Sequence, residues 1–162
     1  MNQIIKAVNE PIKSYKSGSS ERISLQAKYD EMAGQTIEIP LIIGGKDITT
    51  GDTDNCVMPH DHGHILATYH KGGENEVKLA VNSAMDRWKS WSRTSLDERA
   101  AIFRKAAELL QGPWRDTINA ATMLNQSKNA FQAEIDSACE LIDFFNFNAQ
   151  YAEEIYGNQP LI

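Results

Sequence analysis

The sequence predicts an α/β fold in which an N-terminal arm, a β-ribbon and about four helices follow one another along the chain. Residues 1–36 are polar and mixed, with Pro11 and a serine-rich cluster, which is typical of an extended arm that leads into a short helix. Residues 37–72 mix β-branched side chains with glycines and predict strands joined by turns. Residues 73–162 place apolar side chains three and four positions apart, which is the spacing of amphipathic helices.

The short helix of the arm and the strands of the ribbon have recognisable boundaries. Ser19 or Ser20 can cap the start of the helix, and Gly34 can end it. Because a few strands make a poor domain by themselves, we expect the ribbon to pair with strands from elsewhere, later in the chain or in another subunit. We expect strands near residues 39–43, 47–49, 54–58 and 64–70.

Capping signals delimit the helices that follow. A first helix begins near Glu74, and a second begins after Ser95, whose partner Glu98 completes an S-x-x-E capping box. Gly112 should end the second helix, and Pro113 is expected at the first position of the next one. The longest helix should end at Gly157 and pack on a neighbour through an apolar seam formed by Ile135, Ala138, Ile142, Phe145, Ala149, Ala152 and Tyr156.

Composition excludes several functional classes. The net charge is −6 and the pI is about 5.2, which argues against a nucleic-acid partner. No apolar run approaches the ~20 residues that span a bilayer, so we expect no membrane association. Two separated cysteines and the lack of a secretory signal favour the cytoplasm. The apolar end at Leu161 and Ile162 predicts that the sequence given is part of a longer protein.

The four histidines fall within one short stretch and raise the question of a metal site. His60, His62 and His64 alternate, so a regular strand would place all three imidazoles on one face, while His70 lies further on. The alternative is a turn or bulge with exposed imidazoles. Pro59 and the glycine before His64 favour the turn, so we expect no metal here.

The longest helix offers a second candidate site. Glu140 shares a face with Phe144, Phe147 and Tyr151, so that it could serve in acid–base chemistry beside aromatic rings. The alternative, a solvated helix face, is the commoner fate of such residues. The same choice applies to the other carboxylates of this helix, which are Glu134, Asp136, Asp143, Glu153 and Glu154.

Two further features carry little chemistry. Polar side chains crowd residues 125–129, where either a binding surface or a plain polar loop could form. Cys139 lies among apolar neighbours and is expected to be a core residue rather than a nucleophile. No phosphate-binding loop, nucleophile elbow or G-x-G-x-x-G turn is present in the sequence.

Several of these stretches together resemble a known family. The segments IPLIIGGKDITTGDT, VMPHDHGHILATYHKG, ERAAIFRKAAELL and NQSKNAFQAEIDSACELIDFFNFNAQYAEEIYGNQP are similar to the N-terminal part of the glutamate γ-semialdehyde dehydrogenase branch of the aldehyde dehydrogenase superfamily. The likeness runs from about Ile12 to Pro160. Two departures stand out, since Asn125 replaces a common glycine and Asn146 replaces a common arginine.

This resemblance implies an enzyme and a place for each part of the chain. It implies NAD-dependent oxidation of L-glutamate γ-semialdehyde, whose cyclic form is 1-pyrroline-5-carboxylate, to glutamate in proline degradation. The catalytic cysteine, glutamate and asparagine of the family, and its NAD site, would lie beyond this segment; Asn125 and Cys139 do not match those motifs. Glu140 would line the substrate pocket.

The resemblance also implies an assembly. Residues 1–36 would be the arm, 37–72 a ribbon for oligomerisation, and 73–162 the helical part of a domain whose Rossmann-like sheet is absent here. The full-length protein would be a homo-oligomer in the cytoplasm, or in the mitochondrial matrix if the source is eukaryotic. The segment alone would be inactive. A non-enzymatic helical module with an acidic surface is the alternative function, and a histidine metal site is a third.

Overall fold

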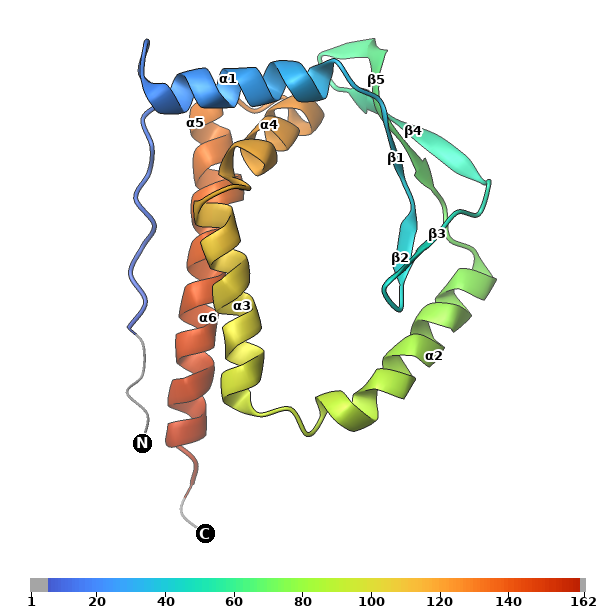
Figure 1. Cartoon of the computed structure of the whole chain (residues 1–162), viewed down its shortest axis with the longest axis vertical. Coiled ribbons are helices and arrows are strands. Elements are labelled where there is room, and N and C mark those ends of the chain that lie inside the picture. The colour runs from blue at the N-terminus through green and yellow to red at the C-terminus, as the bar shows by residue number, and fades with distance from the viewer. Residues whose placement is uncertain (1–5, 161–162) are drawn as a thin grey trace. The chain divides into compact units, whose positions relative to one another are not determined.

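The computed structural model describes residues 6–160 and divides into two compact units (Figure 1). The first unit draws on residues 1–30, 95–123 and 128–162, and the second on residues 31–94 and 124–127. Helices and short sheets are both present, so the predicted α/β character is confirmed. The three predicted domain ranges remain a prediction.

The first unit is an extended arm on a set of helices. Residues 6–16 of the arm have no regular secondary structure, as expected, before the chain enters α1 at Ser20. The helices α3 and α6 lie side by side (Figure 1), and both contribute buried alanines, Ala107 from α3 and Ala149 from α6. The helices that lie wholly or mostly in this unit are α1 (Ser20–Ala33), α3 (Leu96–Gln111), α4 (Arg115–Gln126), α5 (Ala130–Ala133) and α6 (Glu140–Gly157).

The core of this unit is small and lies on the predicted apolar seam. Ile142 is fully buried, and its burial alone contributes about 1.5–3 kcal/mol to folding. Ala149 is buried too, whereas Tyr156, at the end of the seam, is exposed. The central cluster consists of Ala107, Ala138 and Ile142, with Leu110, Ile118 and Phe145 packed against it.

The capping signals set the start and end of α3. The side chain of Ser95 accepts a hydrogen bond from the Glu98 N–H at 3.2 Å, and the Glu98 carboxylate accepts one from the Ser95 N–H at 3.0 Å. Gly112 is the C-cap, as predicted. Pro113 is not the first residue of the next helix, because the Trp114 N–H donates to the Leu109 carbonyl and keeps this segment in a turn.

The longest predicted helix ends at Gly157 as expected, but it is not uniform. Between α5 and α6 lies a π-helical turn over Glu134–Cys139, designated η1. The N–H of Glu140 donates to the carbonyl of Ile135, five residues earlier, instead of the usual four. Periodicity in the sequence does not reveal this one-residue widening.

The second unit contains the strands and α2 (Glu74–Trp91). One sheet has the order β1–β5–β4, with β5 parallel to β1 and antiparallel to β4, and a separate hairpin joins β2 to β3. Gly44 and Gly45 form the hairpin turn with φ of 61° and 77°, a conformation that favours glycine. The strands are β1 (Ile37–Ile39), β2 (Leu41–Ile43), β3 (Lys46–Ile48), β4 (Thr53–Met58) and β5 (Asp61–His70).

These strands match the predicted ones closely, with two differences. The segment predicted near 39–43 is split at Pro40, which cannot donate a hydrogen bond within a sheet. The last strand begins at Asp61 rather than near 64, because pairing with β4 continues past a β-bulge. Pairing of the ribbon with strands from elsewhere remains a prediction.

Candidate functional site

One candidate site is a hollow on the surface of the first unit, bounded by α6 and the arm. Glu140, Phe144, Phe147 and Tyr151 line it from one face of the helix, as the sequence predicts. Its volume is about 400 Å³, within the range of small-molecule sites, about 300–1,000 Å³. The remaining lining residues are Asn9, Asp143 and Asn148.

The chemistry of this hollow suits a small cation with an apolar body. Glu140 and Asp143 supply carboxylates, and no lysine or arginine is among the described residues that line the hollow. Phe147 and Tyr151 lie with ring centroids 6.0 Å apart, and aromatic faces attract a cation as well as packing on methylene groups. The Glu140 side chain is exposed, so it is open to a ligand.

The arm is bound along α6 and forms the rim of the hollow. Asn9 Nδ2 and the Glu10 N–H each donate to the carboxylate of Asp143, both at 2.7 Å. The Ala7 N–H donates to Gln150 Oε1 at 2.6 Å. Asp143 is therefore not simply a solvated helix residue, because it holds the arm in place.

The other carboxylates of this helix divide between solvent and internal partners. Glu153 is paired with Arg104 at 2.7 Å in a partly buried salt bridge, and Asp136 is paired with Lys128 at 2.7 Å. Glu154 accepts a hydrogen bond from Gln150. The expectation of a solvated face is wrong for Glu134, which is fully buried.

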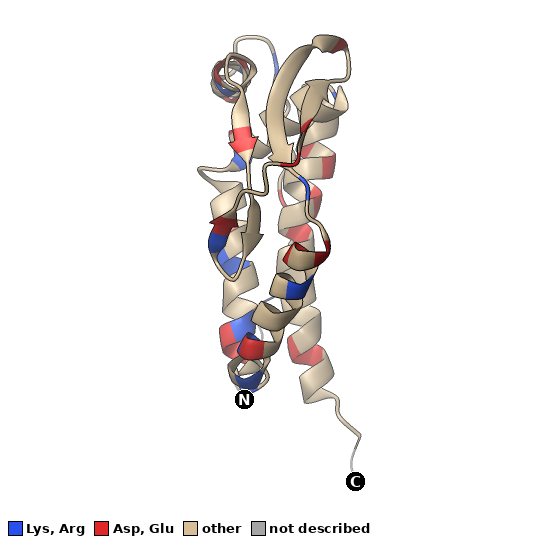
Figure 2. Ribbon diagram, turned by 90° about the vertical axis from the view of Figure 1, so that its right-hand side faces the viewer, with Lys and Arg blue, Asp and Glu red and all other residues tan. Residues whose placement is uncertain are grey.

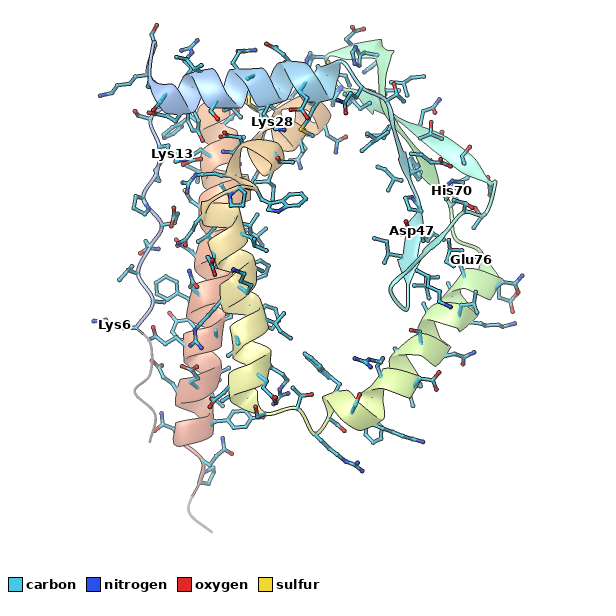
Figure 3. All side chains as sticks on the ribbon, viewed as in Figure 1. Lys6, Lys13, Lys28, Asp47, His70 and Glu76 are labelled. Atoms are coloured by element: carbon cyan, nitrogen blue, oxygen red, sulfur yellow. The ribbon has the colours of Figure 1, made fainter. Side chains whose placement is uncertain are left out.

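Glu134 is the centre of a buried polar cluster that the sequence analysis missed. Its carboxylate accepts hydrogen bonds from the Lys13 N–H at 2.8 Å, from Tyr15 Oη at 2.7 Å and from Asn119 Nδ2 at 2.9 Å. It also forms a salt bridge with Arg115. Figure 3 shows Lys13 on the arm beside the helices, where its backbone reaches this carboxylate. One signal in the sequence could have revealed the burial of Glu134: it lies four residues before Ala138, a residue of the packing seam, and so shares its helix face.

The environment of this cluster fixes the charges in it. Burial by itself would raise the pKa of Glu134, but hydrogen bonds from Arg115, the Lys13 N–H, Tyr15 and Asn119 lower it to about 2. Burial and the neighbouring Glu134 carboxylate raise the pKa of Tyr15 above its usual range, so its phenol stays protonated and donates. The cluster thus holds an ionised carboxylate and a neutral phenol at neutral pH.

Cys139 is buried next to this cluster, as expected for a core residue. Burial and the nearby Glu134 charge raise the pKa of its thiol to about 11. Because the thiolate is the nucleophile, a thiol with this pKa is a poor one at neutral pH. The placement supports the core role and not a catalytic one.

The histidines are not brought together by the structure. His60 lies in a turn, and its ring bonds to the hydroxyl of Ser127 at 2.8 Å. The predicted turn therefore fits His60 but is wrong for His62, which already lies within β5, whereas His64 lies in this strand as predicted. Within residues 6–160, no group of three or more His, Cys, Asp or Glu side chains is arranged to hold a metal ion.

His70 has a structural role at the end of β5 (Figure 3). Its Nδ1 accepts hydrogen bonds from the N–H groups of Thr50 and Gly51, at 3.1 and 3.2 Å. Nε2 therefore carries the proton and donates to the carboxylate of Glu38 at 2.7 Å. The buried ring joins β1, β5 and the turn before β4.

The polar residues near 125–129 bond within the chain rather than form an open binding surface. Asn125 accepts a hydrogen bond from Cys56 Sγ, and Lys128 pairs with Asp136. Asn129 caps α5 through the Gln132 N–H. Ser127, between α4 and α5, adopts a left-handed backbone conformation with a φ of 53°. The loop alternative is therefore the better description.

Comparison with known proteins gives consistent matches. The model of the aldehyde dehydrogenase family matches residues 48–161. The chain is 46% identical over 153 residues to delta-1-pyrroline-5-carboxylate dehydrogenase of Agaricus bisporus, covering 94% of this chain and 28% of that protein. It is 41% identical over 157 residues to the mitochondrial enzyme of that name in Homo sapiens, covering 97% and 28%.

Solved structures agree with these sequence matches. The delta-pyrroline-5-carboxylate dehydrogenase of Mycobacterium tuberculosis, solved with NAD bound, superposes with a TM-score of 0.96 at 41% identity. The match covers 100% of this chain and 30% of that one. The chain therefore spans less than a third of the length of each of these relatives.

Proposed function

This chain belongs to the aldehyde dehydrogenase family, and from that membership we propose that it is part of an enzyme that oxidises L-glutamate γ-semialdehyde to L-glutamate. The electron acceptor in this proposal is NAD, which is bound in the solved structure from Mycobacterium tuberculosis. The activity belongs to the full-length protein, since this chain spans about 28% of the curated relatives.

The observation that carries the proposal is the hollow at Glu140. The substrate is an amino acid, so in its open form it carries an ammonium group, and in its cyclic form an imine nitrogen. Two carboxylates and three aromatic rings suit such a group better than they suit a plain aliphatic aldehyde. A charge-assisted hydrogen bond from the ammonium group to Glu140 would contribute about 1.5–3 kcal/mol to binding.

The residues of this chain bind and orient the substrate in the proposed enzyme. Glu140 accepts the hydrogen bond from the ammonium group, and Phe144 and Phe147 pack on the carbon chain. This fixes the position of the aldehyde end relative to groups elsewhere in the protein. The nucleophilic cysteine, the general-base glutamate and the oxyanion-binding asparagine of the family are expected outside this segment.

The described residues do not fit NAD. A strand does run through glycines into a helix where β5 leads past Gly73 into α2, the arrangement that can bind a phosphate. However, the Gly73 N–H already donates to the Glu76 carboxylate at 2.8 Å, and Glu74 adds a second negative charge. A dinucleotide phosphate would be repelled, so we place the NAD site in another part of the full-length protein.

The proposal extends to assembly and location. Residues 37–72 would pair with strands from later in the chain or from another copy, which gives a homo-oligomer. Acidic and basic residues are interspersed along the ribbons (Figure 2). No helix within residues 6–160 is both long enough and apolar enough to cross a bilayer. Curated relatives include mitochondrial proteins. The proposed compartment is the matrix in a eukaryote and otherwise the cytoplasm.

The test is steady-state kinetics of the full-length protein with two aldehydes. The wild-type protein should reduce NAD with glutamate γ-semialdehyde and, less well, with butyraldehyde, which has no amine. Glu140→Gln should lower kcat/KM about tenfold to a hundredfold for the first substrate and much less for the second. The matched control is Glu108→Gln, which changes an exposed surface carboxylate paired with Lys105.

Either of two results would contradict this proposal. The first is a wild-type protein that forms no NADH with either aldehyde, which would refute the activity. The second is an equal loss on both aldehydes in Glu140→Gln with an unchanged melting temperature, which would remove the ammonium contact while leaving the enzyme class intact.

A further inference from the structure

The π-helical turn η1 immediately precedes Glu140 and is fastened from several sides. Four of its six side chains bond to other parts of the first unit. Two of these bonds are polar contacts with α4, since Ser137 Oγ donates to Thr122 Oγ1 at 2.6 Å and Arg115 Nη2 donates to Cys139 Sγ at 3.4 Å. The other two are the salt bridges of Glu134 and Asp136.

The widened turn decides which way Glu140 faces. An α-helix advances by about 100° per residue, so inserting one residue rotates everything that follows by that amount relative to what precedes. The bond from the Glu140 N–H to the Ile135 carbonyl marks this extra residue. Glu140 and the residues after it are therefore turned by about 100° from where a continuous α-helix would place them, and in this orientation Glu140 lines the hollow.

Glu134 is the strongest of these anchors. It is completely buried, and its carboxylate is bonded to the arm and to α4 at once. By contrast, Asp136 is exposed and Ser137 is half-buried. A turn that is intrinsically less favourable than an α-helix needs such anchors, and π-helical turns of this kind often occur beside functional sites.

We propose that Glu134 is a positioning residue for substrate selection: by anchoring η1 to Arg115 and to the arm, it sets the direction in which Glu140 meets the ammonium group of the substrate. The inference rests on the proposed function of Glu140. It assigns Glu134 no contact with substrate. In this proposal Glu134 affects substrate selection only through the orientation of Glu140, unlike a residue that contributes only to overall stability.

The experiment is a double-mutant cycle in the full-length protein. The variants are Glu134→Gln, Glu140→Gln and the two combined, with Ser137→Ala as a milder disturbance of the same turn. The measured quantity is the ratio of kcat/KM for glutamate γ-semialdehyde to that for butyraldehyde, recorded below the melting temperature of each variant. Glu108→Gln is the surface control.

Glu134→Gln should lower this ratio on the order of tenfold, and Ser137→Ala should lower it less, because a small displacement of a binding group weakens a directed contact. In the Glu140→Gln background, Glu134→Gln should produce no further drop, since the two residues act in sequence. If Glu134 is purely structural, Glu134→Gln will lower kcat/KM equally for both aldehydes and leave their ratio unchanged. That result would overturn the proposal. If Glu134→Gln does not fold, an unchanged ratio in Ser137→Ala overturns it instead.

The outcome separates this inference from the proposed function. If Glu140→Gln keeps the wild-type ratio, the proposed role of Glu140 fails and the inference fails with it. If the ratio of kcat/KM values falls in Glu140→Gln but stays at the wild-type value in Glu134→Gln and Ser137→Ala, only the positioning role is refuted.

Discussion

Arg115 and Glu134 form a salt bridge in which both side chains are withdrawn from water, with exposures of 2% and 0%. Arg115 also pairs with Glu10 on the arm and donates to the Pro11 carbonyl at 3.0 Å, so its guanidinium joins α4, η1 and the arm. Burial by itself favours the neutral form of Arg115 and lowers its pKa, but the bonds to Glu134 and Glu10 outweigh this effect and raise the pKa. This pair is the electrostatic centre of the first unit.

Replacing Arg115 should lower the free energy of unfolding more than replacing Glu134. Arg115→Met leaves the carboxylates of Glu134 and Glu10 without their cation, and we expect a loss of about 3–5 kcal/mol in the free energy of unfolding. Glu134→Gln leaves Arg115 still paired with Glu10, so the loss should be about 1–3 kcal/mol. Urea unfolding of both variants tests this. Equal losses would show that Glu10 does not compensate.

Acid should weaken the protein through Glu134. The pKa of this carboxyl falls from an ordinary value near 4.5 to about 2 on folding. A lowered pKa contributes stability that is fully present above about pH 4.5 and is lost as the pH falls toward 2. We expect the free energy of unfolding to decrease across that window, and less steeply in Glu134→Gln. Parallel pH profiles for the two proteins would contradict the assignment.

The two cysteines of this chain should differ in reactivity. The thiol of Cys139 is buried and its pKa is raised to about 11, so iodoacetamide should label it at least about tenfold more slowly than half-buried Cys56 at pH 8. Mass spectrometry of the labelled peptides measures both rates. In urea the two rates should converge, and rapid native labelling of Cys139 would show that the surrounding core opens.

Local signals made much of the fold predictable. The Ser95 capping box, the Gly112 and Gly157 ends and the turn between the strands expected near 39–43 and 47–49 depend on residues close in sequence, and the structure has each of them. The same holds for the face shared by Glu140 and Phe144, which the helical repeat determines. Each prediction needed only the period of an element or the chemistry of its end.

The missed features depend on distant partners. Glu134 is buried because Arg115, Asn119 and the arm surround it, and none of these is near it in the sequence. The π-helical turn has no sequence period of its own, since its extra residue is stabilised by contacts with α4. Pro113 is a strong start signal, but the turn closed by Trp114 delays α4.

The docking of the arm can be tested one hydrogen bond at a time. Asp143→Ala removes the acceptor of the Glu10 N–H, a charge-assisted bond of 2.7 Å, so exchange of that amide hydrogen should accelerate about tenfold. The Lys13 N–H is bonded to Glu134 instead and should keep its protection, which makes it an internal control. Residue-resolved hydrogen exchange measures both, and Glu108→Ala serves as a surface control. If Lys13 loses protection together with Glu10, the arm detaches as one unit, and the anchor at Glu134 does not hold independently of the one at Asp143.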